Sequence, residues 1–299
     1  MPARLSIRLK LPLLICSLLM GVVLAYSWSV YSEVKRSALG AASDRLRGVT
    51  RQLADLTGTS TRQRIAEISE AAKRPSIIAY LRSGSTAAEP GARDALSGLV
   101  HQQARQNELV RVELWDGRGA SRLGSGADFP ALDPTAAQDL IRSIRPDKSP
   151  VIGPLQASGK VLQYSMIAPV SEGEATLGYV VHRRRLAGTS RAAQQLGALI
   201  GSDQAALFMG NARGDLWTDL VGVVPPPPVS VTTATDRLLE YDRPQSGGRI
   251  AAAAAVAGTP WVLLVEFPRG PVLARARLVS TQLGLIGLAL LAAGGAGAW

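Results

Sequence analysis

Two long apolar runs near the ends of the chain constrain its fold more than any other feature of the sequence. Residues 11–31 and 278–299 are the only uncharged apolar runs of this length. A helix needs about 20 apolar residues to cross the hydrocarbon core of a bilayer, and each run has roughly that length. The sequence therefore predicts transmembrane helices at 11–31 and 278–299, with a globular region between them.

The basic N-terminus predicts on which side of the membrane this region lies. Arg4, Arg8 and Lys10 precede the first run, and no acidic residue accompanies them. Positive charge stays in the cytoplasm, so we expect residues 1–10 to form a cytoplasmic tail. Residues 32–277 are then periplasmic or extracellular. A cleaved signal peptide is the alternative, but no A-x-A site follows the run, and aromatic residues cluster at its far end.

Composition narrows the classes of function. Lys and Arg number 33 against 23 for Asp and Glu, but they are scattered and not interleaved with aromatic residues, so we expect no nucleic acid partner. Biased codon usage or attraction to acidic ligands and lipid headgroups would explain the excess. His101 and His182 lie far apart without ligands at metal-binding spacing, so we predict no metal. The sequence contains no catalytic or cofactor motif, and we predict no catalytic residue and no cofactor.

A long helix is predicted at 32–82, directly after the first run. Apolar residues recur in steps of three and four, the heptad spacing of a two-helix coiled coil, at Leu39, Ala42, Leu46, Val49, Leu53 and Leu56. This favours a homodimer, and an amphipathic helix packed on its own domain is the alternative. Pro75 is expected to break or restart the helix, with loops at 83–85 and 89–91.

Two related modules follow. Residues 109–115 alternate apolar and polar side chains, which predicts a strand, and Gly-rich turns lead into further strands. The order strand, turn, strand, loop, strand, turn, strand occurs in 83–186 and, shortened, in 187–268, with a connecting helix expected at 189–200. Residues 269–277 form a juxtamembrane segment. This order predicts an α+β fold with antiparallel sheets and helices packed on them.

Four segments, in this order, resemble Cache domains, which are PAS-like extracytoplasmic sensor modules: the first three are similar to the core of a Cache domain, and the fourth to the end of a double Cache sensor. They are Val151-Ile152-Gly153-Pro154, Ser158-Gly159-Lys160 leading to Ala168-Pro169-Val170, Leu177-Gly178-Tyr179-Val180-Val181, and Gly258-Thr259-Pro260-Trp261-Val262-Leu263-Leu264-Val265. The resemblance covers about residues 32–277 and implies a double Cache region with two tandem PAS-like modules, in a protein of the bacterial inner (plasma) membrane.

In such regions the membrane-distal module, here 83–186, holds a small ligand, and the membrane-proximal one, here 187–268, passes a shift to the second span. The output is then a cytoplasmic domain beyond Trp299, a HAMP module with a histidine kinase, or else a chemoreceptor or nucleotide cyclase domain. The chain lacks the run of aromatic, Arg, Trp and Asp residues that marks the amino-acid-binding subgroup, so that ligand class does not carry over.

Five residues of the distal module are candidates for ligand binding: Arg111, Trp115, Arg122, Tyr164 and Tyr179. Arg offers a bidentate clamp for a carboxylate, and Tyr and Trp cover an apolar or ring portion, so a carboxylate or an amine is the favoured ligand. The alternative is that Arg111 and Glu113 form a solvated cross-strand pair, and that Trp115 and Tyr164 fill the core.

The segment His182–Arg185 has two interpretations. It is either a solvated strand end or a patch for anions or lipid headgroups, in which His182 would report pH near its ordinary pKa of about 6.5.

The sequence thus favours a small-molecule receptor. The alternative is a bitopic envelope protein whose exported domain docks a protein partner. A sealed apolar core with Arg111 and Tyr164 in solvent would favour docking.

Overall fold

The computed structural model describes residues 7–103, 110–159, 161–186, 205–231, 238–243 and 247–272, and single positions between 281 and 289. For residues 7–17 the description is limited to the backbone. Residues 46–241 together with 251–267 form one compact unit, which we call the larger unit. Residues 1–45, 242–250 and 268–299 form the other.

The two predicted membrane helices stay predictions. The run 11–31 lies within helix α1 (Ile7–Ala72), whereas 278–299 lies almost entirely outside the described residues. In the part of the chain that the structure describes, we find no helix with both the length and the apolar character of a membrane crossing.

Helix α1 continues without a break through Gly58–Thr61, where the sequence pattern weakens. Gly58 is buried, and a Cβ atom there would lie 3.2 Å from the carbonyl oxygen of Ala257. Glycine costs helix stability, but here it allows α1 to pass close to the turn that carries Ala257.

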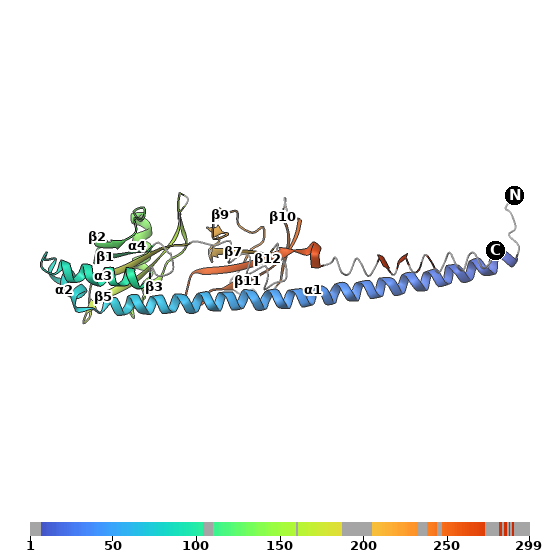
Figure 1. Ribbon diagram of the computed structural model, residues 1–299, viewed down its shortest axis with the longest axis horizontal. Helices are drawn as coiled ribbons and strands as arrows, with labels where there is room; N and C mark the ends of the chain where they lie inside the picture. The colour runs from blue at the N-terminus through green and yellow to red at the C-terminus, as the bar shows by residue number, and fades with distance from the viewer. Residues whose placement is uncertain are drawn as a thin grey trace. The chain divides into compact units, whose positions relative to one another are not determined.

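From Leu46 to Ala72, α1 runs alongside both sheets of the larger unit (Figure 1). Its inward face contributes core residues that include Leu46, Ala54, Ile68 and Ala72. The heptad position Leu56 is instead 60% exposed. For this part of α1 the amphipathic helix packed on its own domain is therefore confirmed, and dimerisation stays a prediction.

Two short helices follow α1. The break expected at Pro75 is present, because α1 ends at Ala72 and α2 (Pro75–Ser83) begins at the proline. Helix α3 begins at Glu89 and ends at Gln103, so the expected loop at 89–91 is wrong. Pro90 lies in the first turn of α3, where its missing N–H would have no helical partner anyway.

The first sheet is antiparallel, with the order β2-β1-β6-β5-β3 and β4 paired to β5. Its elements are β1 (Val110–Asp116), β2 (Ser121–Gly126), α4 (Pro134–Arg142), β3 (Val151–Ile152), β4 (Gln156–Ser158), β5 (Val161–Glu172) and β6 (Ala175–Arg185). Strand β6 is thus central, paired on both edges, while α4 connects β2 to β3.

The second sheet has the order β10-β11-β12-β7-β8-β9, and the described pairs β12–β7, β7–β8 and β8–β9 are antiparallel. Its strands are β7 (Ala206–Asn211), β8 (Trp217–Thr218), β9 (Val223–Val224), β10 (Leu239–Arg243), β11 (Gly247–Ala255) and β12 (Trp261–Pro268). The short strands β4 and β9 and the edge strand β10 were not predicted. The helix predicted at 189–200 lies outside the described residues.

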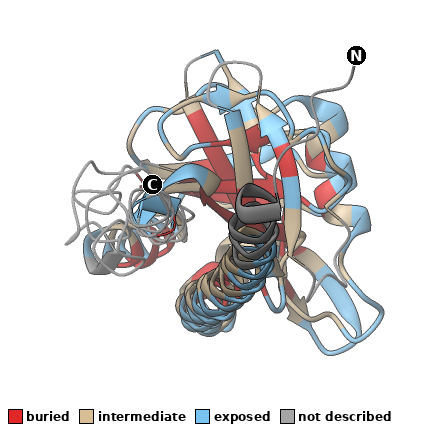
Figure 2. Ribbon diagram, turned by 90° about the vertical axis from the view of Figure 1, so that its right-hand side faces the viewer, coloured by how far each residue is buried: buried red, intermediate tan, exposed pale blue. Residues whose placement is uncertain are grey.

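One apolar core runs through the larger unit and joins the two sheets. Figure 2 shows the buried residues concentrated in the strands. The ring of Tyr164 on β5 meets that of Trp261 on β12 edge-on, with centroids 4.8 Å apart. The Asn211 side chain accepts from the N–H of Leu155 (2.7 Å) and donates to its carbonyl (3.1 Å). Nε1 of Trp261 donates to the carbonyl of Gly153 (3.2 Å). We call these hydrogen bonds the joint.

The structure confirms an α+β fold with a long N-terminal helix and antiparallel sheets. The domain boundaries at 83–186 and 187–268 stay predictions.

Candidate ligand-binding site

The first sheet has two faces, because alternate residues of a strand point to opposite sides. On one face, Val112 and Leu114 of β1 belong to the large core. On the other, β1 presents Arg111, Glu113 and Trp115, and contacts with α4 and with the 127–133 segment cover it. We call this second face the α4 face.

Three charged side chains meet on the α4 face. Nε of Arg111 donates to Oε1 of Glu113, and Nε1 of Trp115 donates to its Oε2 at 2.8 Å. Nη1 of Arg183, on the neighbouring strand β6, lies 3.8 Å from the same Oε1. The carboxylate of Asp128 is 3.8 Å from Nη1 of Arg111, but it is fully exposed. One buried carboxylate is therefore shared by two guanidinium groups.

Arg183 is the most enclosed of these groups, with an exposed fraction of 1%. Its Nη2 donates to the carbonyl of Pro130 (2.5 Å) and to Oε1 of Gln163 (3.0 Å). The ring of Phe129 lies 5.4 Å from its guanidinium carbon. Within the described residues, its Nε has no hydrogen-bond partner. Burial lowers the pKa of Arg183, and the positive charge of Arg111 lowers it further. The carboxylate of Glu113 raises the pKa in part. Because a guanidinium does not deprotonate in proteins, two cations stay here beside the one buried carboxylate of Glu113, and the exposed carboxylate of Asp128 lies near Arg111.

An apolar cluster lies beside these charges. Its buried members are Trp115, Ala137, Leu140, Ile167 and Val181, and Tyr179 packs against it. Trp115 and Tyr179 are cross-strand partners of β1 and β6. Burial raises the pKa of Tyr179, so its hydroxyl is neutral at ordinary pH. The α4 face thus offers charge at one end and an apolar surface with a phenol at the other.

The structure brings three of the five predicted residues together on this face: Arg111, Trp115 and Tyr179. The alternative interpretation of Arg111, a solvated cross-strand pair with Glu113, is wrong. Arg111 and Glu113 are neighbours on the same strand, not a cross-strand pair, and Glu113 is buried.

The other two predicted residues lie elsewhere. Arg122, on β2, is exposed and pairs with Asp116 at 2.8 Å. Burial alone would raise the pKa of Asp116. Hydrogen bonds from the amides of Ala120 and Arg118 and from the Arg122 side chain outweigh this and hold the pKa below its usual value. Tyr164 belongs to the core on the opposite face, as the alternative interpretation had it, and burial raises its pKa. Contact of any of the five with a ligand stays a prediction.

The interpretation of His182–Arg185 as a solvated strand end is wrong for His182–Arg184 and holds only for Arg185, which is exposed. His182, Arg183 and Arg184 are at most 2% exposed, because β6 is central and both of its faces are covered. Burial lowers the pKa of His182 to about 3, and the charge of Arg64 adds to this, so the ring does not titrate near neutral pH. Burial likewise lowers the pKa of Arg184 to about 10.

Sequence reasoning thus missed Arg183 as part of the site. The alternation of 179, 181 and 183 along the predicted strand, read from Tyr179 onward, would have placed Arg183 on the face of Tyr179.

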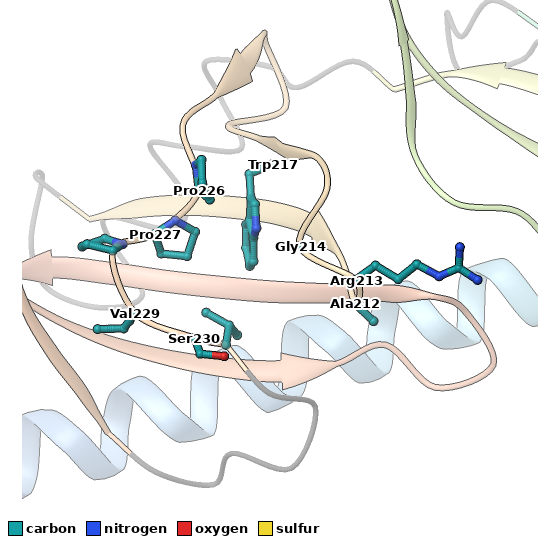
Figure 3. Close-up of a pocket in the computed structure, with 10 residues that line it drawn as sticks. Ala212, Arg213, Gly214, Trp217, Pro226, Pro227, Val229 and Ser230 are labelled. Atoms are coloured by element: carbon teal, nitrogen blue, oxygen red, sulfur yellow. The ribbon is translucent and has the colours of Figure 1, made fainter.

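Among the described residues, two cavities are large enough to be considered as sites. The larger, of about 1190 Å³, is lined by α4, by residues 149–156, by Ser165 and by the turns of the second sheet that carry Asn211–Asp215 and Gly258–Pro260. The smaller, of about 470 Å³, lies in the second sheet between Trp217 and the proline-rich 226–228 segment (Figure 3). None of the five predicted residues lines either one. Within the described part of the chain, no cluster of three or more His, Cys, Asp or Glu side chains is arranged to hold a metal ion.

The comparisons with known proteins concern the fold. No protein-family profile matches the chain, and no curated protein matches it. The extracellular domain of rpHK1S-Z16, a protein assigned as a histidine kinase, is similar with a TM-score of 0.56 and 15% identity, over 79% of this chain and 98% of that one. The ligand-binding domain of the Pseudomonas fluorescens chemoreceptor CtaA, solved with L-isoleucine, has a TM-score of 0.50 and 15% identity, over 81% and 98% of the two chains. The chain therefore has the fold of extracytoplasmic sensor domains, as its resemblance to double Cache regions predicted.

Proposed function

We propose that residues 32–277 form the extracytoplasmic sensor of a two-span bacterial membrane receptor, and that the α4 face of the first sheet binds a small solute with a carboxylate. The fold shared with the two sensor domains supports the role of sensor. The carboxylate of the L-isoleucine bound to CtaA makes such a ligand reasonable in kind, although the α4 face has its own set of residues.

The observation that carries this proposal is the enclosed guanidinium of Arg183 on the α4 face. Arg111 and Arg183 share the carboxylate of Glu113, and one nitrogen of Arg183 has no hydrogen-bond partner among the described residues. Burying an uncompensated charge is costly, so a second carboxylate entering here is stabilised by charge-assisted hydrogen bonds. Trp115 and Tyr179 would contact the remainder of the solute.

Entry of the solute requires the 127–133 segment to move, since Phe129 and Pro130 cover Arg183. A ligand that binds only when the 127–133 segment has moved away from Arg183 shifts the population toward that arrangement. The shift would pass through the joint to the second sheet and on to the second predicted span. We propose a HAMP module and a histidine kinase as the output, with a chemoreceptor or cyclase output as the alternative, and a homodimer formed through α1.

The test is thermal unfolding of the full chain with a panel of small carboxylates and amines. A ligand that binds only the folded state stabilises it by about 2.7 kcal/mol at a concentration 100 times its dissociation constant. We expect at least one carboxylate to raise the melting temperature, and Arg111→Gln to remove this increase. Arg118→Gln, at an exposed turn of the same sheet, is the matched control and should keep it. A panel without any effect contradicts the proposal.

Docking of a protein partner stays the alternative, since none of the five predicted residues lines a described cavity. The pattern that would indicate it has Tyr164 in solvent, whereas this residue is only 5% exposed and packs against Trp261.

A further inference from the structure

The cavity of about 1190 Å³ is a second candidate site, and its lining does not include Arg111, Glu113 or Arg183. One wall is formed by α4 and residues 149–156 of the first sheet, and the other by two turns of the second sheet. Much of the wall is apolar, with Leu140, Ile152, Pro154, Leu155 and Pro260. Its volume is comparable to that of pockets that enclose small organic ligands.

A buried hydroxyl without a partner lines this cavity. Ser165, on β5, is 3% exposed, and its Oγ has no hydrogen-bond partner among the residues that the structure describes. Unpaired buried polar groups are uncommon and cost free energy, which a ligand atom that bonds to the hydroxyl would recover. Ser171, also on β5, has an unpaired hydroxyl too but does not line the cavity.

The charges at the cavity are mixed in sign, and an anion there would be held by Arg213. Its lining includes the arginines 142, 145 and 213 and the aspartates 139 and 215. Arg142 is paired with Asp139 at 2.8 Å, and the charge of Arg145 helps to lower the pKa of Asp147. Arg213 is exposed at the turn between β7 and β8, and its side chain extends away from Trp217, Pro226 and Pro227 (Figure 3). Arg213 thus offers an exposed guanidinium to a ligand in the larger cavity.

The cavity lies next to the joint, so a ligand bound there would affect the contact between the two sheets. Gly153, Leu155 and Asn211 line the cavity, and all three take part in the hydrogen bonds of the joint. A molecule that contacts both walls therefore touches the groups that hold the two sheets together.

We propose that this cavity binds a carboxylate with an apolar or aromatic body, in which Arg213 holds the carboxylate and Ser165 bonds to a polar atom at the other end. The site goes beyond the ligand proposed for the α4 face, since none of its lining residues is Arg111, Glu113 or Arg183.

The probe for the test is para-hydroxyphenylacetate, which has a carboxylate, an aromatic body and a phenol. Its binding to the full chain is followed by saturation-transfer NMR and by isothermal titration, with para-hydroxyphenylacetamide as the uncharged control. We expect saturable binding of the acid at millimolar concentration or below, and binding of the amide at least about tenfold weaker, because a charge-assisted hydrogen bond is lost.

Matched variants locate the site. Arg213→Ala and Ser165→Val should each weaken binding of the acid, by about tenfold or more for Arg213→Ala. Arg118→Ala and Ser171→Val are their controls, at an exposed turn and on the same strand, and should leave the affinity unchanged. Arg111→Gln should also leave it unchanged, which distinguishes this site from the α4 face.

Absence of saturable binding overturns the proposal, and so does an affinity that Arg213→Ala does not change. Because Arg213 is exposed, this variant should fold even where Ser165→Val does not. Failure of the cavity proposal would not change the carboxylate-dependent stabilisation that we expect for the α4 face.

Discussion

At the scale of single residues, burial separates side chains that are adjacent in the sequence. His182 and Arg183 are consecutive on β6, so they point to opposite faces of the sheet. Arg183 meets Glu113, Gln163 and the Pro130 carbonyl on the α4 face. On the core face, among the described residues, neither ring nitrogen of His182 has a hydrogen-bond partner, and Arg64 is the charged group near it. One residue is thus held as a cation and the other as a neutral ring.

His182 should make the fold sensitive to acid. Its pKa in the folded chain is about 3, below the ordinary 6.5, so the unfolded chain binds the proton more readily between these values. Stability is therefore fully present above pH 6.5 and falls as the pH decreases toward 3. From about pH 7 to about pH 5 we expect this group alone to cost about 2 kcal/mol of the free energy of unfolding.

Urea unfolding of the full chain and of His182→Met at the two pH values measures this effect. The variant should lose about 2 kcal/mol less than the original chain between them. At neutral pH it should be at least as stable, since it removes two unpaired buried nitrogen atoms. An equal loss in both proteins would mean that His182 is not held neutral.

At the scale of elements, close backbone approaches determine where glycine is required. Strand β6 passes β1 at Gly178, where a Cβ atom would lie 2.2 Å from the carbonyl oxygen of Trp115 and 3.1 Å from Cδ1 of Leu81. Gly48 on α1 has nothing within 4 Å of the corresponding position. Replacing these two glycines by alanine should therefore have opposite effects on stability.

Gly178→Ala should destabilise the protein by about 2–3 kcal/mol, because the added methyl group forces two paired backbones apart. Gly48→Ala, on an exposed helical site, should stabilise it by up to about 1 kcal/mol, because alanine favours the helix. Thermal unfolding of both variants of the full chain tests the pair. A stable Gly178→Ala variant would show that β1 and β6 separate more widely than described.

At the scale of the whole molecule, the joint makes the two sheets of the larger unit one cooperative body. The Asn211 carboxamide satisfies both backbone groups of Leu155, and the core cluster includes residues of both sheets. A shared core and satisfied buried backbone groups are the conditions for unfolding in a single transition. Under the proposed function, this coupling would let a ligand on the first sheet affect the second sheet.

Asn211→Ala should weaken this coupling. It leaves the buried N–H and carbonyl of Leu155 without partners, at a cost of about 2–3 kcal/mol. In calorimetry we expect one transition for the original chain, and a lower or divided transition for the variant. Arg213→Ala, in the same turn but exposed, is the control and should keep the original transition. An unchanged transition for Asn211→Ala would show that the apolar core alone joins the sheets.

The sequence by itself determined the local patterns of this protein. The alternation of 109–115, the Gly-rich turns and the break at Pro75 correspond to β1, its hairpins and the start of α2, because these signals arise from neighbouring residues. It also placed Arg111, Glu113 and Trp115 on one face, which follows from the period of two in any strand.

Tertiary structure alone decided what covers each face. Whether Tyr164 lies in a core or a site, and whether His182–Arg184 are solvated, depends on β6 being central and on α1 and the 127–133 segment lying over it. The cavity beside the joint likewise depends on segments far apart in the chain, α4 and the turns at 211–215 and 258–260. Burial and cavities arise from contacts between distant segments, and the periodicity of one segment carries no information about which other segment covers it.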